Sequence, residues 1–155
     1  MSIEKVRAHF SAIGEPERII EFEQSTATSE LAAEALGCEV GRIAKTISVF
    51  VDKKPALILM SGDMKIDNRK FKAQFNCRPQ MIPVDKVEGF IGHAVGGVCP
   101  FAVNEGVPIY RDASLERFDT VFPAAGNDKS CARFRTDELD GYINFAGRVD
   151  VAKPK

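Results

Sequence analysis

The sequence predicts a single α+β domain, built on a mixed, partly barrel-like β-sheet of about six or seven strands surrounded by helices. Three observations favour this class. The chain has 155 residues, which suits one hydrophobic core. Runs typical of strands and runs typical of helices both occur, and they do not alternate in the strict order that predicts a fully parallel sheet. We assign residues 1–150 to the domain and expect the short segment 151–155 to fray.

Helices are predicted where apolar residues recur at helical spacing next to capping residues. Val6, Phe10 and Ile13 share one face of the first such segment. Thr28 and Asp67 are typical N-caps, because their side-chain oxygens accept hydrogen bonds from backbone amides of the first turn. The expected helices cover residues 3–13, 29–36, 68–75, a short turn from Asp85 to Gly89 with Asp85 and Glu88 at capping-box spacing, and residues 136–139.

Strands are predicted where β-branched, aromatic and other apolar residues cluster between turn residues. The runs 46–51 and 56–60 are separated by Asp52-Lys53-Lys54-Pro55, a combination that indicates a hairpin. The expected strands cover residues 18–22, 46–51, 56–60, 107–110, 120–124 and 131–134.

Composition excludes several functional classes. Hydrophobic residues make up 45% of the chain and charged residues 28%, a balance typical of a folded domain and not of a disordered segment. No apolar run approaches the roughly 20 residues of a membrane helix. The first ten residues lack the hydrophobic stretch of a signal peptide. We therefore expect a cytoplasmic protein without a membrane partner.

Cysteine and histidine spacing argues against a bound metal. The four cysteines form no C-x-x-C pair, and the two histidines are far apart in the chain. Scattered cysteines of this kind are typical of reduced thiols packed as small apolar groups. No metal and no cofactor are expected.

Charge is unevenly distributed, although the net charge is only −1. Residues 1–40 carry a net charge of −5, whereas residues 65–86 carry +4. A solvated surface is one interpretation of the basic run. A binding site for a polyanion is the other.

The segment 92–101, GHAVGGVCPF, is apolar yet contains three glycines and a proline. Glycine lets the backbone adopt positive φ and approach a ligand closely. Such a bend can direct backbone amides at a carbonyl or an oxyanion. A tight turn beside a buried strand is the alternative interpretation. The segment matches neither of the glycine motifs that bind nucleotide phosphates.

Lys45 stands where the apolar run 46–51 begins. Its side chain either extends its charge to solvent, or it places its ammonium group at the rim of a pocket, where that group can bind a carbonyl or phosphate oxygen. Cys99 and His93 together raise a cysteine hydrolase as a weaker alternative, although no third, orienting residue is evident.

Several segments, taken together and in this order, resemble the YbaK family, also called the prolyl-tRNA-synthetase-associated domain family. The most specific part is a lysine before a β-run followed by a Gly-x-x-x-Pro loop, here Lys45 and Gly96 through Pro100. The matching segments are 28–37, 42–49, 61–71, 92–101 and 136–139, so that the likeness spans roughly residues 20–145.

The resemblance implies a trans-editing deacylase that hydrolyses the ester between a small wrong amino acid, such as cysteine or alanine, and the terminal ribose of tRNA-Pro. It implies that Lys45 is catalytic, and that the protein supplies no nucleophile and needs no cofactor. The implied partners are the 3′ end of aminoacyl-tRNA and prolyl-tRNA synthetase. The implied substrate-binding residues are Thr46, Gly96, Gly97, Val98, Cys99 and Pro100. Thr46 favours cysteine over alanine as the group removed.

Within this interpretation, the basic residues near position 70 are candidates for contacts with tRNA phosphates, because basic side chains dominate backbone affinity. These residues are Lys65, Arg69, Lys70 and Lys72. A non-catalytic module of the same fold, which binds aminoacyl-tRNA or another ligand, is the second hypothesis, because no self-sufficient nucleophile is evident.

Overall fold

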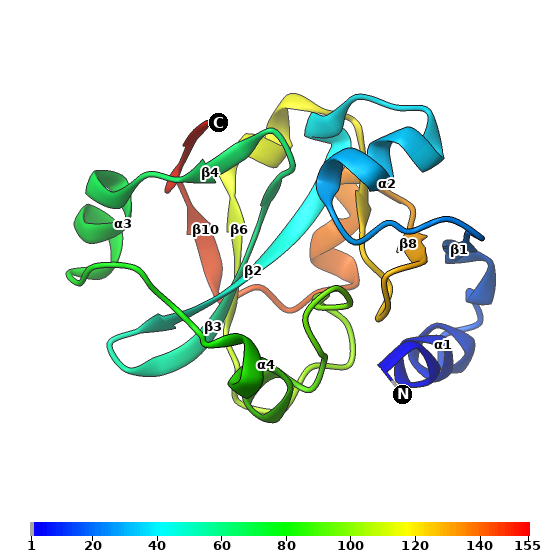
Figure 1. Cartoon of the computed structure of the whole chain (residues 1–155), viewed down its shortest axis with the longest axis horizontal. Helices are drawn as coiled ribbons and strands as arrows, with labels where there is room; N and C mark the ends of the chain where they lie inside the picture. The colour runs from blue at the N-terminus through cyan, green and yellow to red at the C-terminus, as the bar shows by residue number, and fades with distance from the viewer. Residues whose placement is uncertain (1) are drawn as a thin grey trace.

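A curled, mixed sheet of seven strands forms the centre of the molecule (Figure 1). The structure is a computed structural model that describes residues 2–155. Its strands are β2 (Ile43–Val51), β3 (Lys54–Ser61), β5 (Gln80–Met81), β6 (Ile109–Asp112), β7 (Thr120–Pro123), β9 (Phe134–Arg135) and β10 (Gly147–Val149). They lie in the order β10-β6-β3-β2-β7-β9, and β5 also pairs with β2. Since β2 is antiparallel to β3 and parallel to β7, the predicted mixed sheet of six or seven strands is confirmed.

The hairpin between β2 and β3 is the longest pairing in the sheet. Its loop is tighter than the four residues expected, because Val51 already pairs with Lys54. The two loop residues, Asp52 and Lys53, have φ values of 50° and 68°. Positive φ at both central residues is the geometry that joins two twisted antiparallel strands in a two-residue turn.

Two small sheets flank the central one. In the first, β1 (Ile19–Glu21) pairs with β8 (Ser130–Ala132), which confirms strands in both regions. In the second, β4 (Met64–Ile66) pairs antiparallel with β11 (Ala152–Pro154).

The second pair corrects the expectation that residues 151–155 fray. Val151 and Ala152 are buried, and the Val151 amide donates to the Asp112 carboxylate at 2.8 Å. The chain end is therefore held by backbone pairing and by apolar burial. Sequence alone does not reveal this, because the strand's partner is far away in the chain.

Four α-helices and four short 3₁₀ helices are present among the described residues. They are α1 (Ser2–Ala12), η1 (Pro16–Arg18), α2 (Ser29–Leu36), η2 (Val40–Arg42), α3 (Asn68–Phe75), α4 (Val84–Ile91), η3 (Ala113–Arg117) and η4 (Thr136–Gly141). The predicted caps at Thr28 and Asp67 are confirmed. Thr28 Oγ1 accepts from the Leu31 amide, and the Asp67 carboxylate accepts from the amides of Arg69 and Lys70.

Helix α4 differs from its prediction at both ends. It begins after Pro83 and makes no side-chain cap, so Asp85 lies inside the helix instead of capping it. It continues past Gly89 to Ile91 and ends at Gly92, whose φ is 100°. The reason is packing, since Val87 and Ile91 bury one helical face in the core, whereas Gly89 faces open space.

Burial on both faces of β3 organises the core. Leu57 and Leu59 point into a cluster that includes residues of α1 and α4. Ile58 and Met60 point the opposite way, into a cluster with Phe71 of α3. This follows from the alternation of side chains along a strand, and it explains why the run 56–60 is continuously apolar.

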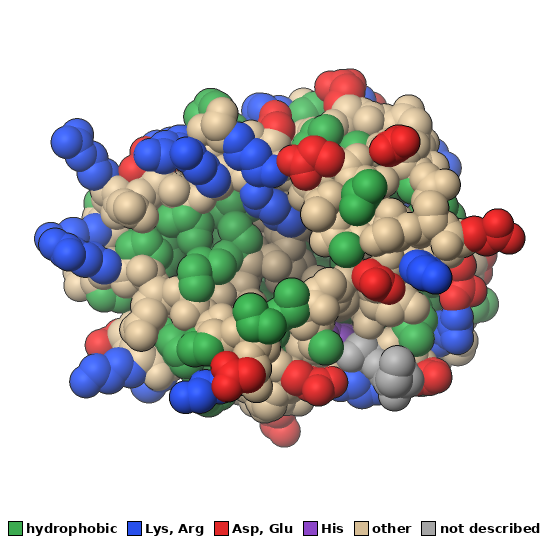
Figure 2. Space-filling model, viewed as in Figure 1, with side chains coloured by type: hydrophobic (Ala, Val, Ile, Leu, Met, Phe, Trp, Pro, Cys, Tyr) green, Lys and Arg blue, Asp and Glu red, His purple; other side chains and the backbone are tan. Residues whose placement is uncertain are grey.

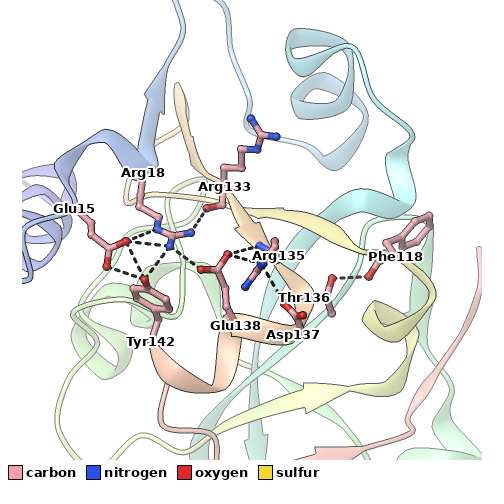
Figure 3. Close-up of polar contacts among 9 residues, drawn as sticks. All are labelled: Glu15, Arg18, Phe118, Arg133, Arg135, Thr136, Asp137, Glu138 and Tyr142. Atoms are coloured by element: carbon pink, nitrogen blue, oxygen red, sulfur yellow. Dashed lines mark hydrogen bonds and ion pairs between the residues drawn. The ribbon is translucent and has the colours of Figure 1, made fainter.

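Arg18, near the start of the chain, is bonded to residues of the segment 133–142 (Figure 3). Its guanidinium donates to Glu138 at 2.7 Å and to Glu15 at 3.0 Å. The same group lies 4.7 Å from the ring centre of Phe134 and 4.6 Å from that of Tyr142, distances at which cation–π attraction operates. The cluster connects η1 with η4 and lies apart from the cavity described next.

Candidate functional site

A cavity of about 380 Å³ opens between β2, residues 26–29 at the start of α2, the start of α4 and the segment 95–98. Figure 2 shows a hollow in this central part of the face. The cavity is lined by Thr26, Ala27, Thr28, Ser29, Ala32, Ile43, Ala44, Lys45, Thr46, Ile47, Ser48, Met81, Ile82, Val84, Val87, Val95, Gly96, Val98, Phe122, Ala124 and Cys131. Four of the residues singled out in the sequence therefore meet here: Lys45, Thr46, Gly96 and Val98.

Lys45 is half-buried on β2, where it faces Met60 of β3 in the strand register. Its Nζ donates a hydrogen bond to the carbonyl of Met64, at the first residue of β4. The strand thus delivers an ammonium group to the wall of the cavity, and β4 holds that group in place.

Burial, followed by the positive charge of Lys155, lowers the pKa of Lys45 to about 8. The carboxylates of Glu30 and Asp63 oppose this shift. A less solvated ammonium group interacts more strongly with an oxygen brought close to it. The charge of Lys45 is consequently available at neutral pH, but it is lost more readily than that of an exposed lysine.

The glycine bend places only part of its backbone on the cavity wall. Gly96, with a φ of 95°, and Val98 line the cavity. Gly97 is buried against another loop, and a Cβ added to it would lie 2.4 Å from the carbonyl oxygen of Gly126. Its amide donates to the carbonyl of Ala94 at 3.0 Å. Gly97 thus permits a close approach between two loops, while Gly96 and Val98 line the cavity.

Cys99 and Pro100 are buried and do not line the cavity. The Cys99 thiol does lie 3.5 Å from Nε2 of His93, but both side chains are fully buried. Nε2 of His93 is also 2.6 Å from the carbonyl of Phe101, so it donates its proton there and offers the thiol no base. Burial raises the pKa of Cys99 to about 12. This pair lacks both the thiolate and the substrate access that a cysteine hydrolase requires.

Replacing Cys99 with alanine is expected to leave any hydrolytic activity of the protein within about threefold of the unchanged chain, once stability is corrected for. The loss of buried volume is expected to cost about 1–2 kcal/mol of unfolding free energy. Steady-state hydrolysis and urea unfolding of the same preparations check this. A variant that stays folded and loses activity would restore the cysteine-hydrolase hypothesis.

Two buried hydroxyls belong to residues of the cavity wall, Thr46, identified in the sequence, and Thr26, which is only 8% exposed. The Thr26 hydroxyl interacts with the neighbouring Cys131 thiol, whereas the Thr46 hydroxyl has no hydrogen-bond partner within residues 2–155. Buried hydroxyls are nearly always hydrogen-bonded, so Thr46 indicates a polar ligand group at this wall. Sequence reasoning missed Thr26. Its only signal was its position two residues before the N-cap of α2.

One side of the cavity mouth is apolar. Met81, Val84 and Val95 line the cavity and are 59%, 74% and 56% exposed. Large apolar side chains exposed around an opening are typical of a surface that a ligand covers. They come from β5, α4 and the glycine-rich segment, which meet only in the folded chain.

The four predicted phosphate-binding residues do not line the cavity. Lys65 lies on β4, whereas Arg69, Lys70 and Lys72 lie on α3, and all four are exposed. Lys70 is engaged, because its Nζ donates to the Ala152 carbonyl at 2.8 Å. Figure 2 shows Lys and Arg side chains gathered over this part of the face and extending to the central hollow.

Within the described part of the chain, no group of three or more metal-ligating side chains comes together. Over the same residues, the helices are too short or too polar to cross a bilayer.

Comparison with known proteins places this geometry in a family. The model of the aminoacyl-tRNA editing domain matches residues 23–142. The uncharacterized protein YwhH of Bacillus subtilis is 39% identical over 154 residues, covering 99% of this chain and 98% of that protein. EbsC of Enterococcus faecalis, named as a candidate Cys-tRNA(Pro)/Cys-tRNA(Cys) deacylase, is 29% identical over 101 residues, which is 64% of this chain and 62% of its own.

A solved structure agrees over almost the whole fold. The crystal structure of a candidate trans-editing enzyme for prolyl-tRNA synthetase superposes with a TM-score of 0.86 at 27% identity, covering 98% of this chain and 97% of that one. The resemblance drawn from the sequence is thereby confirmed. The matched segment contains the lysine of β2, the glycine bend and all the residues that line the cavity. This chain belongs to the aminoacyl-tRNA editing domain family.

Proposed function

We propose that the protein is a deacylase that acts in trans on mischarged aminoacyl-tRNA, with the aminoacyl group bound in the 380 Å³ cavity. The observation that carries this proposal is the meeting of Lys45 and Gly96 on the walls of one cavity in a chain of the editing family. The similarity to a candidate trans-editing enzyme and to EbsC supports the same reaction class.

The proposed reaction needs no nucleophile from the protein. A water molecule, which a ribose hydroxyl can orient, attacks the ester carbonyl carbon and gives up a proton; with a cysteinyl group, the substrate's own thiol can attack instead, give up its proton and form a thiolactone that water then opens. The bond from that carbon to the ribose oxygen breaks, and the ribose oxygen takes up a proton. Because an aminoacyl ester is already activated, positioning and stabilisation of the developing negative charge are sufficient for a large acceleration. Lys45 supplies the positive charge near the reacting oxygens.

The walls of the cavity favour a small aminoacyl group with a polar tip. Ile43, Val98 and Phe122 limit its size, so that a second site of this kind excludes larger residues sterically. The unpartnered hydroxyl of Thr46 offers a hydrogen bond that an alanyl side chain cannot use. We therefore propose cysteine in preference to alanine as the residue removed, with tRNA-Pro as the carrier.

Purified protein tested against alanyl-, cysteinyl-, seryl- and threonyl-tRNA, each in matched and mismatched form, examines the proposal directly. The expected result is multiple-turnover release of cysteine from mischarged tRNA-Pro. Saturable binding without turnover on any of these substrates would instead favour the non-catalytic binding module.

The pH dependence of the reaction is expected to report the charge of Lys45. Since the ammonium form is needed and its pKa is about 8, the enzymatic rate, corrected for spontaneous ester hydrolysis, is expected to fall as the pH rises above about 8. The variant Lys45→Arg keeps its charge throughout this range. Its residual activity should therefore lack this falling limb, while any titration of the substrate amine persists. An identical limb in both proteins would assign the titration elsewhere.

A further inference from the structure

A pair of lysines stands on the small sheet formed by β4 and β11. In its antiparallel register, Lys65 lies directly opposite Lys153. Both side chains are exposed, and directly opposite residues place their side chains on the same face. Two like charges in this position destabilise the pairing of the strands, unless an anion lies between them.

The strand β11 is nevertheless firmly held. The Val151 amide donates to Asp112, and the Val151 carbonyl accepts from the Asp67 amide at 2.8 Å. Val151 and Ala152 pack in the cluster that contains Phe71. The position of Lys153 is therefore set by the fold, and the lysine pair is a fixed feature of the surface.

Nearby carboxylates neutralise the pair only in part. Within residues 2–155, neither Lys65 nor Lys153 forms an ion pair, because the neighbouring acidic groups have other partners. Those contacts are Asp63 with Arg117 at 2.7 Å, Glu30 with Lys155 at 2.8 Å, Asp150 with Lys70 at 3.2 Å, and Asp67 with the first amides of α3. The charge of the Asp67 carboxylate acts on Lys153, but it is shared with Lys70 and the first amides of α3, so the lysine pair keeps a net positive charge.

The lysine pair lies next to the mouth of the cavity. Met64, the neighbour of Lys65, gives its carbonyl to the ammonium of Lys45. Lys155, two residues beyond Lys153, reaches Glu30 in the first turn of α2, where Ser29 lines the cavity. Figure 2 shows several Lys and Arg side chains gathered beside the central hollow.

We propose that β4 and β11 form the phosphate-binding side of the mouth, where Lys65 and Lys153 hold a backbone phosphate of the single-stranded 3′ end of aminoacyl-tRNA. This inference rests on the proposed function, and it adds a strand that lies outside the matched segment 23–142. A single strand is held by basic groups along its backbone and by apolar surfaces against its bases. The apolar residues Met81, Val84 and Val95, on another side of the opening, provide the second kind of contact.

The test compares two substrates in the double variant Lys65→Ala/Lys153→Ala. One is an acceptor-stem RNA minihelix charged with cysteine, and the other is cysteinyl-adenosine, which has the ester but no phosphate. The ratio of kcat/KM for the minihelix to kcat/KM for the nucleoside is expected to fall about tenfold, through KM. The dependence of log kcat/KM on log salt is expected to weaken by about 0.7 for each phosphate that the variant no longer neutralises.

Lys54→Ala is the matched control, because Lys54 is an exposed lysine at the tip of the β2–β3 hairpin. It should leave the ratio unchanged. An unchanged ratio in the double variant would overturn the inference while the proposed function stands. If the unchanged protein hydrolyses neither substrate, the proposed function fails, and binding of the uncharged minihelix decides the inference. Weaker binding by the double variant then supports it, and equal binding overturns it.

Discussion

Replacing Lys45 with alanine is expected to lower deacylation of mischarged tRNA by about 10²–10³-fold while the protein stays folded. The substitution removes the ammonium group from the wall of the cavity, so the negative charge that develops on the ester oxygens loses a fixed positive neighbour. The fold should tolerate the change, because burial already disfavours this charge, as its lowered pKa shows. Single-turnover deacylation and thermal unfolding of the same preparation measure the two effects.

Two further variants test whether the effect comes from the charge of Lys45. Lys45→Arg keeps the charge in a larger, planar group, and it is expected to retain more activity than Lys45→Ala. Lys54→Ala removes an exposed lysine that does not line the cavity and should behave as the unchanged protein. Full activity of a folded Lys45→Ala protein would remove Lys45 from the mechanism.

Replacing Gly97 with alanine is expected to cost about 1–3 kcal/mol of unfolding free energy and to lower activity as well. The new Cβ would lie 2.4 Å from the carbonyl oxygen of Gly126 and 2.9 Å from Cα of Asn127, so one of the two loops has to move. Because Gly96 and Val98 flank the changed residue on the cavity wall, any movement of the bend alters the cavity. Urea unfolding and kcat/KM for cysteinyl-tRNA measure the effects.

Gly89→Ala is the matched control for this substitution. Gly89 lies within α4, and an added Cβ would meet no atom within 4 Å. Alanine is favoured over glycine by about 1 kcal/mol inside a helix, so this variant should be equally or more stable. If Gly97→Ala were as stable as Gly89→Ala, the close contact between the two loops would not restrict residue 97.

Local sequence was sufficient for most of the secondary structure. Thr28 and Asp67 cap their helices as predicted, because a cap depends on residues within one turn. The capping box at Asp85 was wrong, since the burial of Val87 and Ile91 sets the limits of α4. The expectation that residues 151–155 fray was also wrong, because β11 is stabilised by β4 and by Asp112, both distant in sequence.

Part of the candidate site was likewise predictable from local sequence, and part of it only from the tertiary structure. Residue type and order pointed to Lys45 and the glycine bend, because a cation before an apolar strand and several glycines in an apolar run are unusual locally. Whether these residues share a cavity depended on the pairing of β2 with β3 and β7 and on the packing of the bend against Gly126. The buried hydroxyl of Thr26 and the lysine pair of β4 and β11 became visible only through these long-range contacts.

The physical reason is the range of the interactions. Propensity, capping and turn geometry act over a few residues, so the order of amino acids already sets the helices, the hairpin and the α+β class. Burial, unpartnered polar groups and the meeting of charges arise between segments that only packing brings together. Packing therefore decided which side chains face the cavity, which cysteine is sealed in the core, and which lysines stand beside the opening.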